Sequence, residues 1–104
     1  MDDNILTTKW NKATIYVNRH GNRYVISVES PYLMGAKKVW FVIWADGTKD
    51  QWHDEKSGVT EGNLSYCYNY LPNGPRNAWY NIHLYFKDSK EKQQFLDEAK
   101  FHVD

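Results

Sequence analysis

Apolar and polar residues alternate with a period of two in short runs along most of the chain. Tyr24, Ile26 and Val28, for example, are separated by single residues and face one side of an extended backbone. This pattern is typical of half-buried β-strands, and no amphipathic pattern of helix length occurs before residue 90. The predicted strands lie in the stretches 15–17, 24–29, 37–45, 49–58, 63–71, 79–89 and 99–103. About seven antiparallel strands at this spacing predict an all-β sandwich of the immunoglobulin or fibronectin kind.

One predicted strand, in the stretch KKVWFVIWADG, is apolar on both of its faces. An antiparallel sheet in a small domain usually buries one face and leaves the other in water. We take Val39, Phe41 and Ile43 as core residues. Trp40 and Trp44 then lie on the outer face of the sheet, where the presence of two tryptophans needs a reason.

Immunoglobulin-like strand order places the strand at 37–45 beside the strand at 79–89 in one sheet. The outer residues of both strands would then form one aromatic and partly polar surface. Such a surface suits sugars, because their C–H faces stack on flat rings while their hydroxyls pair with polar side chains. The candidate contact residues are Trp40, Trp44, Trp52, Trp79, His83 and Tyr85.

The aromatic face could also arise in three ways that involve no sugar. The N-terminal segment could cover it, with Trp10 folded over the rings. A neighbouring domain could pack on it, since a large exposed apolar patch marks an interaction site. Cross-strand aromatic pairs also stabilise a sheet by about 0.2–1 kcal/mol each without any ligand. The sequence leaves all three open.

With 104 residues, the chain is predicted to form one domain around one core. We expect residues 1–12 to be a lead-in and residues 13–104 to be the domain. The 13 basic and 13 acidic residues balance, which gives no support for nucleic-acid or membrane-surface binding. The acidic N-terminus does not resemble a signal peptide, and no apolar run reaches transmembrane length.

Residues that could carry catalysis are scattered along the chain. The single cysteine, Cys67, cannot form an intradomain disulfide, and we expect it to be half-buried in a strand. The stretch WHDE puts one histidine and one glutamate on the same strand face, which is too few ligands for a metal site. Asp46, Asp50 and Asp54 lie near a turn, where aspartates usually cap the backbone. We therefore predict no enzymatic activity, no metal and no cofactor.

A tyrosine near the start of the penultimate strand, Tyr80, stands where immunoglobulin-like folds place a tyrosine corner.

The stretch from VWFVIWADGTKDQWH to WYNIHLYFKDSKEKQQFLDEAKFHV resembles the Bsp-like repeat of streptococcal and lactobacillal surface proteins. In that family a valine-rich strand ends in Trp, a Gly-x-x-Asp-x-x-Trp-like segment follows, and a Tyr-Asn-Ile-His-x-Tyr strand comes later. Trp44, Asp50 and the string YNIHLY occupy those places here, and the resemblance covers residues 13 to 103.

The sequence departs from the family in the loop before this strand. A glycine and a histidine that usually precede the tyrosine are missing, and Asn77, Ala78 and Trp79 stand there instead. The Trp-Tyr pair after the aspartate becomes Trp52 and His53. These departures affect what the loop at 70–79 does and leave the predicted fold as it is.

The resemblance implies a non-catalytic accessory module of a bacterial cell-surface or cell-wall-hydrolase protein, positioned on peptidoglycan or another wall polymer. It implies an extracellular location, as part of a longer secreted protein, with a wall glycan or an adjacent domain as the partner. We expect the isolated domain to be a monomer that does not insert into membranes. The alternative is a structural spacer or protein-interaction domain whose aromatic face packs on a neighbour.

Overall fold

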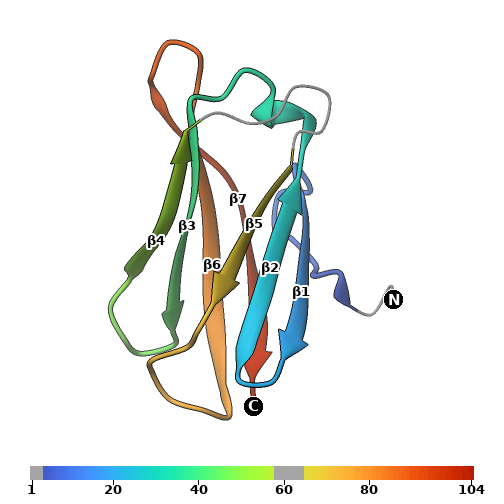
Figure 1. The fold of residues 1–104 in the computed structure, drawn as a ribbon, viewed down its shortest axis with the longest axis vertical. Coiled ribbons are helices and arrows are strands. Elements are labelled where there is room, and N and C mark those ends of the chain that lie inside the picture. The colour runs from blue at the N-terminus through green and yellow to red at the C-terminus, as the bar shows by residue number, and fades with distance from the viewer. Residues whose placement is uncertain (1–3, 58–64) are drawn as a thin grey trace.

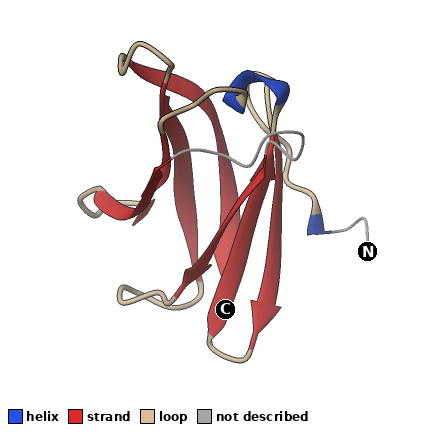
Figure 2. Cartoon of the chain, turned by 45° about the horizontal axis from the view of Figure 1, so that its top comes forward, coloured by secondary structure: helices blue, strands red, loops and turns tan. Residues whose placement is uncertain are grey.

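The strands of this chain form two antiparallel sheets. The computed structural model describes residues 4–57 and 65–104, with side chains described for all of these except 52–57 and 65. One sheet has the order β1-β2-β5 and the other the order β4-β3-β6-β7 (Figure 1). The strands are β1 (Thr14–His20), β2 (Arg23–Glu29), β3 (Lys38–Ala45), β4 (Gln51–Ser57), β5 (Ser65–Tyr70), β6 (Ala78–Lys87) and β7 (Gln93–Val103). Little helix is present (Figure 2), so the predicted all-β class is confirmed.

The hydrophobic core lies between the two sheets. Ile15 and Ile26 come to it from the β1-β2-β5 sheet, and Phe41 and Ile82 come from the other sheet; all four are fully buried. The ring of Phe41 packs on that of Tyr66 in β5, with 5.5 Å between the ring centroids. Because successive side chains of a strand point to opposite faces, the alternation in the sequence supplies this core.

Strand β3 is buried on both faces. Val39, Phe41 and Ile43 belong to the core, as predicted. Trp40 and Val42 point the opposite way and are nevertheless only 2% and 3% exposed. β3 is an inner strand of its sheet, paired with β4 along one edge and with β6 along the other.

Residues 4–12, predicted as a lead-in, lie along the open side between β1 and β7. Ile5 forms a β-bridge with Tyr16 of β1, and Thr8 forms one with Ala99 of β7. The segment therefore joins the edge strands of the two sheets and closes part of the gap between them (Figure 1). We call residues 4–12 the N-terminal strap.

A buried carboxylate in β7, that of Asp97, holds the strap in place. Its Oδ1 accepts hydrogen bonds from the N–H groups of Trp10 and Glu98, at 2.9 Å each. Its Oδ2 accepts from Lys12 at 2.9 Å and from Ala13 at 3.1 Å. Burial by itself raises the pKa of Asp97, but the backbone hydrogen bonds together outweigh burial and lower the pKa below its usual value.

The predicted tyrosine corner is present at the start of β6. The hydroxyl of Tyr80 donates to the carbonyl oxygen of Pro75 at 2.7 Å, five residues upstream. A Cβ atom at Gly74 would lie 2.9 Å from the same hydroxyl, so a larger residue there would have to displace it. The bond ties the β5–β6 loop to the first residues of β6.

Two details differ from the sequence predictions. Cys67 is exposed and not half-buried, because Tyr66 and Tyr70 on either side of it take the inward positions of β5. The last strand begins at Gln93, earlier than the predicted stretch 99–103. The β6–β7 register shifts at a bulge, because Leu84 pairs with Asp97 but Tyr85 pairs with Phe95. The bulge interrupts the period-two pattern of β7, so the pattern does not extend back to Gln93.

Candidate functional site

The outward side of the β4-β3-β6-β7 sheet, which we call the outer face, brings together several of the predicted contact residues. Strands β3 and β6 are neighbours, as predicted, with Trp40 opposite Tyr85 and Trp44 opposite Asn81. His83 lies between Tyr85 and Asn81 along β6, two residues from each, and so points to the same face. The pairing of two separate strands thus creates one aromatic surface.

Trp40 supports this surface from within and does not offer a ring to solvent. Its side chain is 2% exposed, and its ring lies 5.8 Å from that of Tyr85 with the two planes 10° apart. Stacked cross-strand pairs of this kind stabilise a sheet. A buried ring cannot stack on a sugar, so the predicted contact role of Trp40 does not fit its position.

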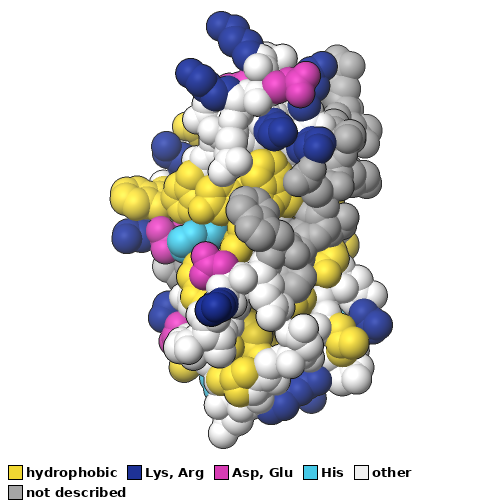
Figure 3. All heavy atoms as spheres, turned by 90° about the vertical axis from the view of Figure 1, so that its left-hand side faces the viewer, with side chains coloured by type: hydrophobic (Ala, Val, Ile, Leu, Met, Phe, Trp, Pro, Cys, Tyr) yellow, Lys and Arg dark blue, Asp and Glu magenta, His cyan; other side chains and the backbone are white. Residues whose placement is uncertain are grey.

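The rings that do reach the surface form a row across β3, β6 and β7. Trp44 packs edge-on against His83 at 4.7 Å between centroids. Phe95 packs in the same way against His83 and against Tyr85, at 5.4 Å in both cases. We call Trp44, His83, Tyr85 and Phe95 the aromatic row. Figure 3 shows hydrophobic side chains gathered beside a histidine on the side of the molecule that carries β4.

Sequence reasoning missed Phe95, which is 41% exposed. The β6–β7 bulge places Phe95 directly opposite Tyr85, although β7 continues with two buried residues in succession, Leu96 and Asp97. The available signal was a Phe-Leu pair between polar residues, in the stretch KQQFLDE. Which face of the sheet this phenylalanine occupies depends on the bulge.

Polar side chains border the aromatic row. The Nε2 atom of His83 lies 3.3 Å from a carboxylate oxygen of Glu98. Asp46 accepts a hydrogen bond of 2.8 Å from the Asn81 amide, and the Lys100 ammonium lies 3.3 Å from it. The bond from Asn81, followed by that from Lys100, holds the pKa of Asp46 below its usual value. The face therefore offers hydrogen-bond acceptors and donors within reach of its rings.

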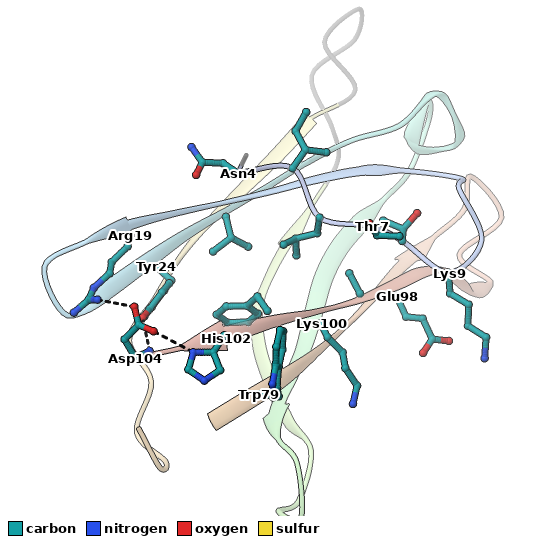
Figure 4. Close-up of a pocket in the computed structure, with 16 residues that line it drawn as sticks. Asn4, Thr7, Lys9, Arg19, Tyr24, Trp79, Glu98, Lys100, His102 and Asp104 are labelled. Carbon is teal, nitrogen blue, oxygen red and sulfur yellow. Dashed lines mark hydrogen bonds and ion pairs between the residues drawn. The ribbon is translucent and has the colours of Figure 1, made fainter. Parts of the chain in front are cut away.

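Trp79 lies near the other end of β6 and has no ring contact with the aromatic row among the described residues. It is 53% exposed, and its ring packs edge-on against His102 of β7 at 5.2 Å. The Nδ1 atom of His102 is 3.0 Å from Asp104 (Figure 4). Trp79 therefore stands at one end of the outer face, beside the edge strand β7.

A groove of about 720 Å³ begins at this edge and runs between β7 and the N-terminal strap (Figure 4). Tyr24 and Phe101 form part of its apolar wall, with their rings 5.5 Å apart. An ion pair of 2.9 Å between Arg19 and Asp104 lies at one end (Figure 4). The groove lies beside the edge strand β7, whereas the aromatic row lies on the outer face.

Trp10 of the strap does not fold over the aromatic row. Its side chain is 50% exposed, and its indole N–H donates to Glu98 at 3.4 Å. The strap thus reaches the border of the outer face at Glu98 and leaves Phe95 exposed beyond it. Cover by Trp10, which would have accounted for the aromatic face without a ligand, is therefore not observed.

Some predicted features fall on residues that are not fully described. The backbone of Trp52 pairs with Val42 of β3, but its side chain lies outside the described residues, as do those of His53 and Glu55. Where side chains are described, no three His, Cys, Asp or Glu residues gather as metal ligands would. In the same part of the chain, no helix has the length and apolar character needed to cross a membrane.

Comparisons of the chain with protein-family models, with curated proteins and with solved structures gave no match. The resemblance to Bsp-like repeats therefore remains a prediction. The geometry of the outer face has to support a function by itself. Its chemistry, one exposed and several half-buried rings beside a carboxylate, an amide and an ammonium group, suits non-covalent recognition of a ligand that has both apolar faces and hydroxyl groups.

Proposed function

We propose that this chain is a non-catalytic module that binds a glycan of the bacterial cell wall through its outer face. The aromatic row with its polar border is the observation that carries this proposal. Trp44, Tyr85 and Phe95 supply ring surface, while Asn81 and Glu98 supply groups for hydrogen bonds. A sugar ring presents C–H faces and a rim of hydroxyls, so its binding needs both kinds of group in one place.

The proposal includes a fold of the immunoglobulin or fibronectin kind, with about seven strands in a sandwich. Two observations support this fold: the two antiparallel sheets contribute to one core, and Tyr80 forms a tyrosine corner. The resemblance to Bsp-like repeats supports a place beside a catalytic module, on the outside of the cell. There the module would act by raising the local concentration of its neighbour on the wall, without chemistry of its own.

A second candidate function is favoured by one observation. Phe95 and Trp79 are large hydrophobic side chains that are 41% and 53% exposed near the two ends of the outer face. A neighbouring domain that packed on the face would cover both. The chain would then be a spacer or a protein-interaction domain, and the isolated chain would not bind cell walls.

Retention of the purified chain on insoluble cell walls tests the proposed function. Trp44→Ala should weaken binding about tenfold, as expected when one well-placed aromatic contact is removed. Tyr32→Ala is the matched control, because Tyr32 is a 54% exposed aromatic residue in the 3₁₀ helix Pro31–Leu33, away from the outer face. No retention of the native chain, or equal loss in both variants, would overturn the proposal.

A further inference from the structure

Four lysines gather at the end of the sheet where β3 begins and β6 turns into β7. The N–H of Lys37 donates to the carbonyl oxygen of Lys87 at 2.7 Å. Lys90 and Lys92 lie in the turn, and their N–H groups both donate to one oxygen of Asp88 at 2.9 Å. Basic side chains cluster at the top of the molecule in Figure 3. We call Lys37, Lys87, Lys90 and Lys92 the lysine end.

The four lysines of the lysine end outnumber the two carboxylates of its turn, Asp88 and Glu91. None of its four ammonium groups takes part in the ion pairs found among the described residues. The Asp88 carboxylate in the turn is engaged by backbone N–H groups and, at 3.1 Å, by the Gln94 amide.

The excess of positive charge is local to the lysine end, since the chain as a whole has no net charge. The lysine end also adjoins the aromatic row. Lys87 follows Tyr85 by two positions on β6, so both side chains point to the outer face at a spacing of roughly 7 Å along the strand. A ligand stacked on Tyr85 and Phe95 would therefore reach Lys87 with its next group.

We infer that the ligand of the outer face is an acidic polysaccharide, whose sugar rings lie on the aromatic row and whose acidic groups pair with the lysine end. The inference rests on the proposed function, because it uses the same face. Lysine ammonium groups are compact, hydrated charges on flexible stems. They suit the repeated acidic groups of a polymer, which do not have to be held in one fixed geometry. Charge complementarity together with the neighbouring rings selects this class of ligand.

Two polymers with the same backbone test the inference: polygalacturonate, which is acidic, and its fully methyl-esterified form, which is neutral. The native chain should bind polygalacturonate more tightly, and the difference should shrink as salt is raised through about 0.1 M, where screening acts over about 10 Å. Lys90→Glu with Lys92→Glu should weaken binding of the acidic polymer at least about fivefold and leave the neutral polymer unaffected. These side chains can be changed without removing the backbone bonds to Asp88.

Arg23→Glu is the matched control, because Arg23 is an exposed residue at the start of β2 in the other sheet. It should leave the preference for the acidic polymer unchanged. Equal, Trp44-dependent binding of both polymers would overturn the acidic ligand and leave glycan binding in place. Binding of neither polymer would also overturn it, while retention on cell walls decides the proposed function separately. Single-stranded DNA bound as tightly as polygalacturonate would show that the lysines recognise polyanions and not an acidic glycan.

Discussion

The two faces of the β4-β3-β6-β7 sheet are built by the same strands and have opposite chemistry. On the inner face, Phe41, Ile82 and Leu84 are fully buried against the other sheet. On the outer face, Tyr85 and His83 alternate with those residues along β6 and are only partly buried. One alternating sequence therefore supplies a dry core on one side and a mixed aromatic and polar surface on the other.

This difference separates the residues that stabilise the fold from those available for binding. The inner face is apolar, and each side chain removed from water there contributes to stability. On the outer face, Asp46 is paired with Lys100, and His83 is paired with Glu98, in partly or largely exposed positions. An exposed ion pair such as that of Asp46 with Lys100 contributes only about 0–1 kcal/mol, so stability alone does not account for this arrangement.

The largest effect is expected from removal of an inner-face ring. Phe41→Ala leaves a cavity beside Tyr66 at a fully buried position, and should lower the free energy of unfolding by about 3–5 kcal/mol. Urea unfolding monitored by tryptophan fluorescence measures the change. Trp79→Ala, at a 53% exposed position, is the comparison and should stay within about 0.5 kcal/mol of the native chain. Similar losses in both variants would contradict the distinction between the two faces.

A smaller loss is expected at the buried carboxylate that holds the strap. Asp97→Asn retains the size of the side chain but replaces one acceptor oxygen by a donor, next to backbone N–H groups that need acceptors. The expected loss is about 1.5–3 kcal/mol, the range for a hydrogen bond to a charged group. Hydrogen exchange of the Lys12 and Ala13 amides should accelerate in the variant. Asp50→Asn, at an exposed position in the β3–β4 turn, serves as the control and should change neither property.

The same carboxylate predicts how stability depends on pH. The pKa of Asp97 is lowered in the folded chain, so its contribution is fully present above the pKa of the unfolded state, about 3.9. The contribution is lost as the pH falls from there through the folded-state pKa. Acid unfolding of the native chain should therefore be steeper than that of Asp97→Asn as the pH falls below about 4. Parallel acid-unfolding curves would show that the strap is held by other contacts.

Much of the fold was predictable, because it follows from alternation within single strands. Val39, Phe41 and Ile43 were assigned to the core from the pattern alone, and the structure places them there. The pairing of β3 with β6 followed from the general order of immunoglobulin-like sheets. These features depend on local sequence and on a topology that many β proteins share.

The remaining features depend on contacts between distant parts of the chain. The burial of Trp40 requires Tyr85 to be stacked on it from the next strand. The position of Phe95 on the outer face requires a bulge, and no residue type in the sequence predicts that bulge. Asp97 lies in a charged stretch and has the pattern of a surface residue. The strap and Ala13, 84 to 87 positions earlier, supply the N–H groups that let it be buried. Period-two patterns contain no information of that kind.

Apart from the control variants, the smallest loss of stability is expected at Phe95, which also gives the sharpest test of the two faces. Its ring packs on Tyr85 but remains 41% exposed. Phe95→Ala should therefore lower the free energy of unfolding by about 1 kcal/mol or less, the range for a single cross-strand aromatic pair. Binding to cell walls should nevertheless fall severalfold, because the ring forms part of the aromatic row. If Phe95→Ala instead destabilised the chain as much as Phe41→Ala does, the outer face would be a second core, completed by a neighbouring domain, and the spacer function would fit the chain better.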